Sequence, residues 1–275
     1  MKGYLRVKRG LVKRHERLGP ALYWGQGIHK AMGVLLATGG DQRAAIECFM
    51  SFYTDNPWET DKGLTTQLAA ERILNYTECY AAWISQHEVL ALEHYFEFPL
   101  YEDKSLPWWC GRIDLIARNK QTGQVLGDDW KSTGQMTSSK IETMRMKTQF
   151  RMYQNYLKHH SQWKDYVGDV FLCDHILTVA KSQYATDPRW PLRRERIQGT
   201  PSMLARAVRD QRKWIEAIDF FQADGKEPPM NDDQCNKYNA VCPYYSLCSQ
   251  PEELRETQIA MLYDEKHWDP AGVED

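Results

Sequence analysis

Three residues near the middle of the sequence, Asp114, Asp129 and Lys131, have the types and spacing that metal-dependent hydrolysis requires. Side chains two residues apart share a face of a strand, so two neighbouring strands joined by a turn bring all three to one part of a sheet. Carboxylate oxygens bind hard cations such as Mg²⁺, and a lysine beside them orients water or stabilises developing charge. This combination indicates phosphodiester hydrolysis. We expect Ile113 and Leu115 to line the opposite face of the first strand.

Two segments with helical periodicity contain further polar residues. Gly25 and His29 are four residues apart, and so are Gln149 and Tyr153, which places each pair on one face of a helix. Taken singly, each motif has an ordinary interpretation. A histidine on an apolar helix is more often a core residue, an Asp-x-Lys triplet is usually a solvated strand end, and a Gln-x-x-x-Tyr pair is ordinarily helix surface and core. Their joint occurrence in one order favours a functional site.

In this order the motifs resemble those of the PD-(D/E)XK nuclease superfamily, specifically its RecB-like branch. The resemblance rests on Gly25 to His29, on Gly-Arg-Ile-Asp-Leu-Ile from Gly111, on Asp-Asp-Trp-Lys-Ser-Thr from Asp128, and on Gln149 to Tyr153. It implies an α/β (α+β) fold with a restriction-endonuclease-like core, in which helices flank a central mixed β-sheet. It also implies a metal-dependent DNA nuclease, expected to act as an exonuclease.

The resemblance assigns the metal centre residue by residue. His29, Asp114 and Asp129 would bind one or two Mg²⁺ or Mn²⁺ ions, with the Trp130 carbonyl as a further ligand. Lys131 would position the attacking water. Metal coordination lowers the pKa of that water and neutralises charge on the phosphate, so no covalent nucleophile is needed.

Three supporting residues follow from the same resemblance. Glu93 matches a glutamate often found before the first strand and would contact the metal through water, although Glu97 competes for this role and Glu93 could instead be an exposed strand-edge acid. Gln149 and Tyr153 would orient the lysine or contact the DNA backbone.

Three of the seven cysteines, Cys235, Cys242 and Cys248, fall within fourteen residues. Clustered thiolates suggest a soft metal or an iron–sulfur cluster. This C-terminal cysteine-rich segment resembles the iron–sulfur staple of AddB-type, CRISPR-associated and phage exonucleases, which implies a 4Fe-4S cluster. That staple usually has its first cysteine upstream of the helical histidine motif, yet none precedes His29. Three explanations for the missing cysteine are open. We favour the first, that the sequence begins a few residues late. Alternatively, a scattered cysteine such as Cys48 substitutes, or the cluster is incomplete or replaced by zinc.

The composition is that of a globular protein: 275 residues, 42% apolar and 26% charged, with a formal charge of −2. It excludes disorder, collagen and coiled coil. No apolar run approaches the roughly 18 residues that span a bilayer, and the N-terminus lacks a hydrophobic signal core. We therefore expect a soluble, cytoplasmic protein without a membrane partner, and the family resemblance implies a bacterial or phage-infected cell.

Charge is unevenly distributed along the chain. Residues 1–20 contain seven basic groups and one acid, and residues 189–213 contain eight basic groups and two acids. Clustered basic side chains neutralise backbone phosphates and release counterions, so we predict that Arg193, Arg194 and Arg196 contact DNA. The alternative is a solvated helix face.

Periodicity predicts helices over 25–36, 64–87, 139–160 and 202–221, and strands over 91–101, 108–118, 125–132 and 167–179. Ser139 with Glu142 predicts a capping box for the third helix, with Met146 facing inward, and Ser202 predicts the cap of the fourth. We predict a single RecB-like nuclease domain over 1–275. Its parts are an N-terminal helical part (1–90), a catalytic sheet and helix (91–180), a C-terminal helix with the cysteine motif (181–248) and an acidic tail (249–275).

The leading hypothesis is thus a DNA exonuclease of recombination, repair, phage DNA processing or CRISPR adaptation. A helicase, recombinase or integrase is the kind of partner that would deliver its DNA. The rival hypothesis is a nuclease-fold DNA-binding or assembly protein that no longer cleaves, and a third is a zinc-binding interaction module. The oligomeric state cannot be deduced from the sequence.

Overall fold

The computed structural model describes residues 11–13, 20–53, 63–103, 107–166, 170–178, 191–223, 236–237 and 240–265. The chain forms two compact units, a larger one of Leu18–Arg209 and a smaller one of Met1–Arg17 with Asp210–Asp275. The single nuclease domain over 1–275 stays a prediction.

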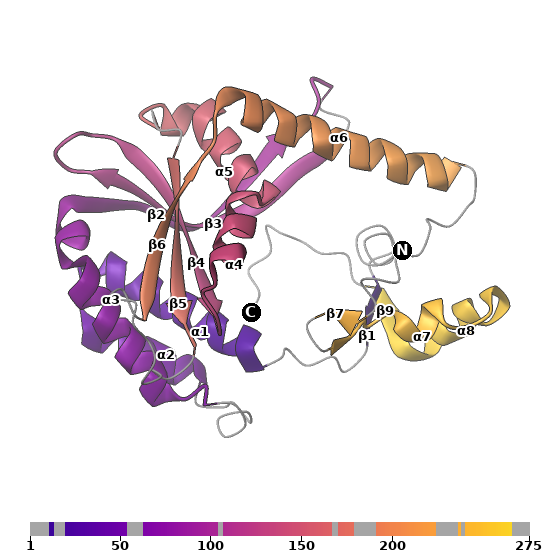
Figure 1. The fold of residues 1–275 in the computed structure, drawn as a ribbon, viewed down its shortest axis with the longest axis horizontal. Coiled ribbons are helices and arrows are strands. Elements are labelled where there is room, and N and C mark those ends of the chain that lie inside the picture. Colours follow the sequence, from indigo (N-terminus) through magenta and orange to yellow (C-terminus); the bar gives the residue numbers. More distant parts are fainter. Residues whose placement is uncertain are drawn as a thin grey trace. The chain divides into compact units, whose positions relative to one another are not determined.

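A five-stranded mixed sheet forms the centre of the larger unit (Figure 1). Its order is β2-β3-β4-β5-β6, and only β4 and β5 run parallel. The strands are β2 (His87–Pro99), β3 (Trp108–Asn119), β4 (Val125–Thr133), β5 (Val170–Leu177) and β6 (Leu192–Gln198). The expected meander of three antiparallel strands is confirmed, and β5 lies within the fourth predicted strand. β6 was not predicted, because its sequence was interpreted only as a basic segment.

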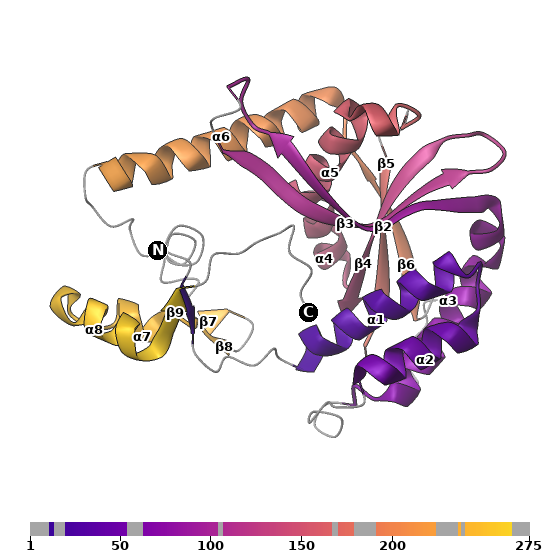
Figure 2. The same ribbon diagram turned by 180° about the vertical axis from the view of Figure 1, so that it is seen from behind.

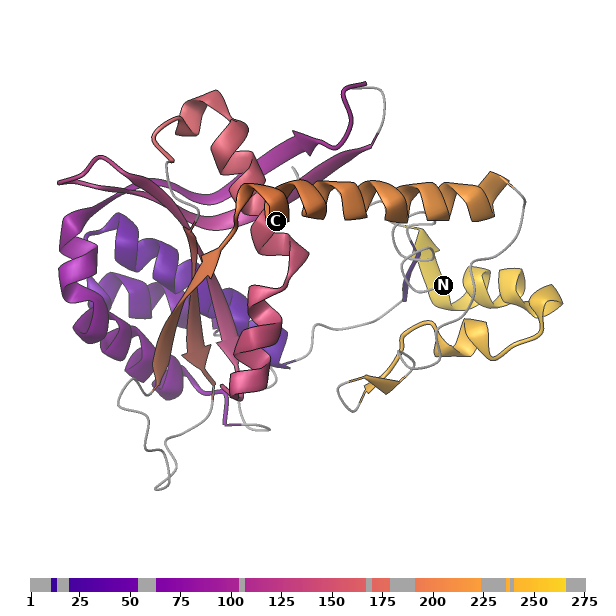
Figure 3. The same cartoon turned by 45° about the horizontal axis from the view of Figure 1, so that its top comes forward.

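Helices cover both faces of this sheet, which confirms the predicted fold class (Figures 2 and 3). One face packs against α1 (Pro20–Ala37), α2 (Gln42–Tyr53) and α3 (Thr66–Gln86), and its core includes Trp24, Ile73 and Trp130. The other face packs against α4 (Ser138–Arg145) and α5 (Thr148–His159), which is followed by a 3₁₀ turn at Ser161–Trp163. This second core includes Phe150, Leu157 and Phe171. α2 was not predicted, although Ala45, Phe49 and Tyr53 recur at helical spacing and are buried.

The long helix predicted over 139–160 is instead two helices, which is a correction. Lys147 has extended backbone angles (φ −62°, ψ 130°) and separates α4 from α5. The cap of α4 is Thr137, whose side chain accepts a hydrogen bond from the Lys140 N–H, rather than Ser139. Met146, predicted to face inward, is 68% exposed because it lies at this break.

α6 (Pro201–Ala223) confirms the last predicted helix but not its cap. The Thr200 hydroxyl, rather than Ser202, accepts from the Met203 N–H at 3.4 Å. Among the described residues, no helix is long and apolar enough to cross a membrane.

The smaller unit contains short elements around its own core. β1 (Leu11–Lys13) pairs antiparallel with β9 (Tyr263–Glu265), and β7 (Asn236–Lys237) pairs with β8 (Ala240–Val241). Its further helices are α7 (Tyr245–Cys248) and α8 (Glu252–Leu262). Tyr244, Leu247, Ile259 and Tyr263 form its buried core.

Candidate metal centre

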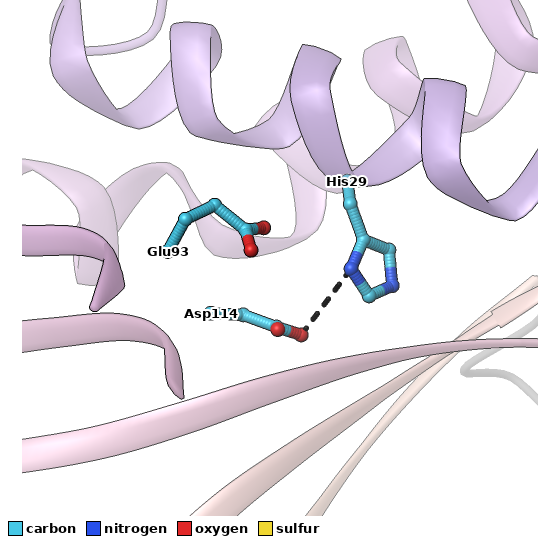
Figure 4. A group of neighbouring side chains, drawn as sticks. All are labelled: His29, Glu93 and Asp114. Carbon is cyan, nitrogen blue, oxygen red and sulfur yellow. Dashed lines mark ion pairs between the residues drawn. The ribbon is translucent and has the colours of Figure 1, made fainter. Parts of the chain in front are cut away.

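Three residues from separate elements of the larger unit converge on one point: His29 of α1, Glu93 of β2 and Asp114 of β3 (Figure 4). One ligand atom from each lies within 4.8 Å of the others, and His29 Nδ1 lies 3.5 Å from Asp114 Oδ2. Within the described ranges, this is the one group of three or more histidine, cysteine or acidic residues with that spacing. An imidazole and two carboxylates are a donor set that suits a divalent cation.

The position of His29 follows from the close packing of α1 on β4. Gly25 lies one turn earlier, and a Cβ there would come within 2.6 Å of the Ser132 hydroxyl oxygen. Glycine therefore permits the close approach. The His29 ring then packs edge-on against Trp130, with centroids 5.9 Å apart, and hydrogen bonds to the Trp130 backbone. The structure thus places the predicted Trp130 carbonyl beside His29.

Glu93 enters the site through an irregular part of β2. Its φ is +46°, the one positive φ of a non-glycine residue in the described chain. The flanking ladder pairs, Leu92 with Leu115 and His94 with Ile113, place Glu93 across from Asp114. Such backbone angles cost energy for a residue with a side chain and often occur at functional sites. Glu93 is therefore favoured over its sequence competitor.

That competitor, Glu97, makes a different contact. Its carboxylate accepts a hydrogen bond from the Tyr95 hydroxyl. The prediction that Ile113 and Leu115 share one face of β3 is wrong. Ile113 packs with Ile116 under α5, whereas Leu115 belongs to the core under α1 to α3. Strict alternation is interrupted at Asp114.

Asp129 and Lys131 lie on β4 beside this group. The Lys131 Nζ is 2.5 Å from Asp129 Oδ2, and the side chains are 28% and 1% exposed. The next backbone N–H, that of Trp130, donates to Asp114 Oδ2 at 2.7 Å and so ties the carboxylate of β3 to β4. The four residues predicted for the centre, His29, Asp114, Asp129 and Lys131, therefore lie near one another, and Glu93 lies beside them.

Burial shifts the ionisation of the centre. It raises the pKa of Asp114 to about 7 and, with the nearby Asp114 charge, that of Asp129 to about 6. Glu93 is an exposed residue, and partial desolvation raises its pKa, whereas burial together with the Lys131 charge lowers the pKa of His29 to about 4. Burial opposes the Lys131 charge, but Asp129 and Asp114 raise its pKa overall. A neutral imidazole beside the buried Asp114 and Asp129 and the exposed Glu93 fits a divalent cation, which would stabilise the ionised acids.

The predicted pair on α5 faces the same region. The Gln149 amide donates to the Tyr153 hydroxyl at 2.7 Å. Tyr153 is buried against Phe96, with ring centroids 5.5 Å apart, and interacts electrostatically with Lys131. Gln149 and Tyr153 thus form a hydrogen-bonded pair near Lys131, and their role in orienting the lysine stays a prediction.

Cationic side chains that sequence analysis missed lie around the carboxylates. Lys30 and Arg112 interact electrostatically with Glu93. Lys147, at the break between α4 and α5, lies near Asp129 and Lys131, and burial together with the Lys131 charge lowers its pKa. Lys147 occurs two residues before Gln149 in the sequence, which is the signal that could have identified it.

The three arginines predicted to bind DNA lie on β6 and differ in exposure. The Arg194 side chain is 15% exposed and its guanidinium pairs with Asp174, which favours a structural role over the predicted contact with phosphate. Arg193 forms an ion pair with Glu195. Arg196 is exposed, and no described residue forms an ion pair with it. The geometry leaves Arg196 as the accessible member of the set.

The cysteines of the predicted cluster lie in the smaller unit. Cys242 and Cys248 are partly exposed and pack against its core, and Cys235 lies outside the described residues. Cys48, the substitute considered from the sequence, lies on α2 of the larger unit. The iron–sulfur assignment stays a prediction.

Comparison with known proteins adds one finding. A family model described as the PD-(D/E)XK nuclease superfamily matches residues 3–249. A search of curated proteins finds no match. The matched region contains the whole candidate metal centre, the α5 pair and the three clustered cysteines.

Proposed function

Because the chain belongs to the PD-(D/E)XK nuclease superfamily, we propose that it is a Mg²⁺- or Mn²⁺-dependent deoxyribonuclease of the RecB-like branch, acting as an exonuclease. One observation carries this proposal: the acids and imidazole of the candidate metal centre converge beside the ion pair of Lys131 with the buried Asp129. The proposed setting is recombination, repair, phage DNA processing or CRISPR adaptation, with a helicase, recombinase or integrase as partner.

Each residue has a chemical task in this proposal. His29, Asp114 and Asp129 would hold the cation with the Trp130 carbonyl, and Glu93 would contact it directly or through water. When bound, the cation lowers the pKa of a coordinated water and neutralises charge on the scissile phosphate. Lys131, a protonated donor next to Asp129, orients the attacking water by hydrogen bonding.

Residues of α5 and the surrounding cations support that step. Tyr153 and Gln149 restrict the position of the lysine, since the buried Tyr153 interacts with Lys131 and is held by its hydrogen bond with the partly buried Gln149. Lys30, Arg112 and Lys147 supply positive charge where a phosphodiester backbone would approach the carboxylates. We place the DNA path along these residues rather than along Arg193 and Arg194.

The proposal is tested by incubating end-labelled single- and double-stranded DNA with Mg²⁺ or Mn²⁺, and with EDTA. Lys131→Ala should reduce cleavage by roughly 10²-fold or more, because the donor to the attacking water is lost. Lys120→Ala is the matched control, an exposed lysine whose amine bonds the Ser85 carbonyl. Equal cleavage by Lys131→Ala and wild type would overturn the mechanism. DNA binding without metal-dependent cleavage would instead support the rival DNA-binding function.

For the smaller unit we propose that Cys235, Cys242 and Cys248 bind a 4Fe-4S cluster with a further ligand. The support is their spacing and the partly exposed positions of the two described cysteines. Iron and sulfide analysis of protein purified without oxygen should detect iron and sulfide in equal amounts. Zinc in their place would support the alternative of a zinc-binding module.

A further inference from the structure

A buried polar network lies behind the metal centre and joins three strands to one helix. We call it the Arg194 brace: Arg194 of β6, Asp174 of β5, Asp128 of β4 and Tyr76 of α3. Arg194 Nε donates to Asp174 Oδ1 at 2.7 Å, and its Nη2 donates to Asp174 Oδ2 at 2.6 Å. The same Nη2 lies 3.4 Å from Asp128 Oδ2, and Tyr76 donates its hydroxyl to Asp174 Oδ2 at 2.7 Å.

The surroundings of the brace leave it little freedom. The Asp128 and Asp174 side chains are 0% and 2% exposed. The Arg194 guanidinium lies over two rings, 4.3 Å from the Tyr80 centroid and 4.4 Å from that of Trp83. A planar guanidinium that is both stacked and bidentately paired has a fixed orientation, which an ammonium could not reproduce.

Asp128 connects this network to the metal centre. One of its oxygens faces Arg194, and the other, Oδ1, accepts a hydrogen bond from the Asp129 N–H at 2.9 Å. Because side chains alternate along a strand, Asp128 and Trp130 share the face of β4 that packs under α1 to α3. Asp129 and Lys131 share the other face, where Asp129 still interacts electrostatically with His29 and Asp114. The brace therefore holds the peptide from which Asp129 projects.

We propose that Asp128, held by Arg194, is a positioning residue for the metal centre. It fixes the backbone at Asp129 so that this carboxylate and the Trp130 carbonyl meet His29 and Asp114 in one arrangement. The inference rests on the proposed metal-dependent function. Residues that orient metal ligands typically contribute about 10- to 100-fold in metal affinity or activity.

The test measures Mn²⁺ affinity by calorimetry on metal-free protein, together with kcat and KM for DNA. Arg194→Lys keeps the charge but loses the bidentate fork, and Asp128→Asn keeps the shape and one acceptor oxygen. We expect each to weaken Mn²⁺ binding by about 10-fold and to lower kcat more than it changes KM. Asp128→Ala should have a larger effect than Asp128→Asn, which retains an acceptor for the Asp129 N–H.

Asn155→Ala is the matched control for lost stability. Asn155 is also buried, but it hydrogen bonds the Arg151 and Leu204 carbonyls, away from the metal centre. It should lower the melting temperature and leave Mn²⁺ affinity unchanged. Wild-type Mn²⁺ affinity in folded Arg194→Lys and Asp128→Asn would overturn the proposal, as would absence of Mn²⁺ binding to the wild type. Mn²⁺ binding that these variants weaken, without DNA cleavage by the wild type, would support the brace and overturn only the nuclease function.

Discussion

Glu93 lies across the β2–β3 ladder from Asp114, and it does so with a left-handed backbone that no other described non-glycine residue adopts. The side chains on both strands change their alternation at this point. In a regular ladder, successive side chains of each strand would point to alternate faces of the sheet. The irregularity instead brings the carboxylates of Glu93 and Asp114 together beside His29. The backbone conformation that brings the two acids together costs energy. Selection for stability alone would therefore not favour it, which indicates a functional reason.

We predict that Glu93→Gly makes the metal-free protein more stable and less active. Glycine adopts a φ of +46° without strain, so the free energy of unfolding should rise by about 0.5–1 kcal/mol. Cleavage should fall because a carboxylate of the centre is lost. Urea unfolding in EDTA and a cleavage assay measure the two effects.

Glu97→Gly is the control for this substitution. Glu97 lies in the regular part of β2, where glycine should reduce stability and leave metal-dependent cleavage intact. Wild-type cleavage by Glu93→Gly would contradict the assignment of Glu93 to the centre.

We predict a favourable coupling between substitutions at Gly25 and Ser132. In Gly25→Ala the new methyl group meets the Ser132 hydroxyl at 2.6 Å, so the hydroxyl must rotate or α1 must move, which displaces His29. In the Ser132→Ala background the nearest atom is a Cβ at 3.6 Å, an ordinary contact, and alanine favours the helix. A double-mutant cycle of urea unfolding should give a coupling of about 1 kcal/mol. Cleavage should fall in Gly25→Ala and recover in the double variant, whereas additive effects would contradict close packing as the role of Gly25.

Residue type and strand spacing alone predicted that Asp114, Asp129 and Lys131 would lie together in the candidate metal centre. His29 was assigned through the family resemblance, because a histidine on an apolar helix is by itself more often a core residue. The sequence could not decide between Glu93 and Glu97, because the decision depends on one backbone angle that strand alternation does not predict.

The failure to predict strand β6 has a different cause. Its buried positions include Glu195, and its partly buried Arg193 and Arg194 are neutralised by carboxylates on the same or the neighbouring strand. Hydropathy detects strands by apolar alternation, so a strand stabilised by ion pairs resembles a basic surface segment. Cross-strand pairing becomes visible only once Asp174 and Arg194 are known to be neighbours.

We predict that Lys147 contributes to DNA binding. Lys147→Ala should raise KM for DNA with little change in kcat, and should reduce the slope of log affinity against log salt concentration by about 0.9 for double-stranded DNA. Binding titrations at several salt concentrations measure this slope. Lys120→Ala should leave it unchanged, because Lys120 lies at the β3–β4 turn. If Arg196→Ala but not Lys147→Ala changes the slope of log affinity against log salt concentration, the DNA contacts lie along β6 instead.

We predict that His175 makes the protein sensitive to acid. Its pKa is lowered to about 4 by burial, which outweighs the opposing charges of Glu195 and Asp174 and acts with those of Lys140 and Arg193. The unfolded chain binds a proton near pH 6.5, so between about pH 6.5 and 4 the unfolded state holds one more proton than the folded state. The stabilising contribution is therefore complete above about pH 6.5 and decreases as the pH falls, by up to about 3 kcal/mol.

The test is the difference in unfolding free energy between wild type and His175→Gln from pH 8 to pH 4. A difference is required because Asp114 and Asp129, with pKa values of about 7 and 6, act in the opposite direction and stabilise the metal-free fold in acid. Glutamine does not titrate, so the wild type should lose stability relative to the variant only below about pH 6.5. A difference that is constant across this range would show that His175 does not titrate as its burial beside Cys173 demands.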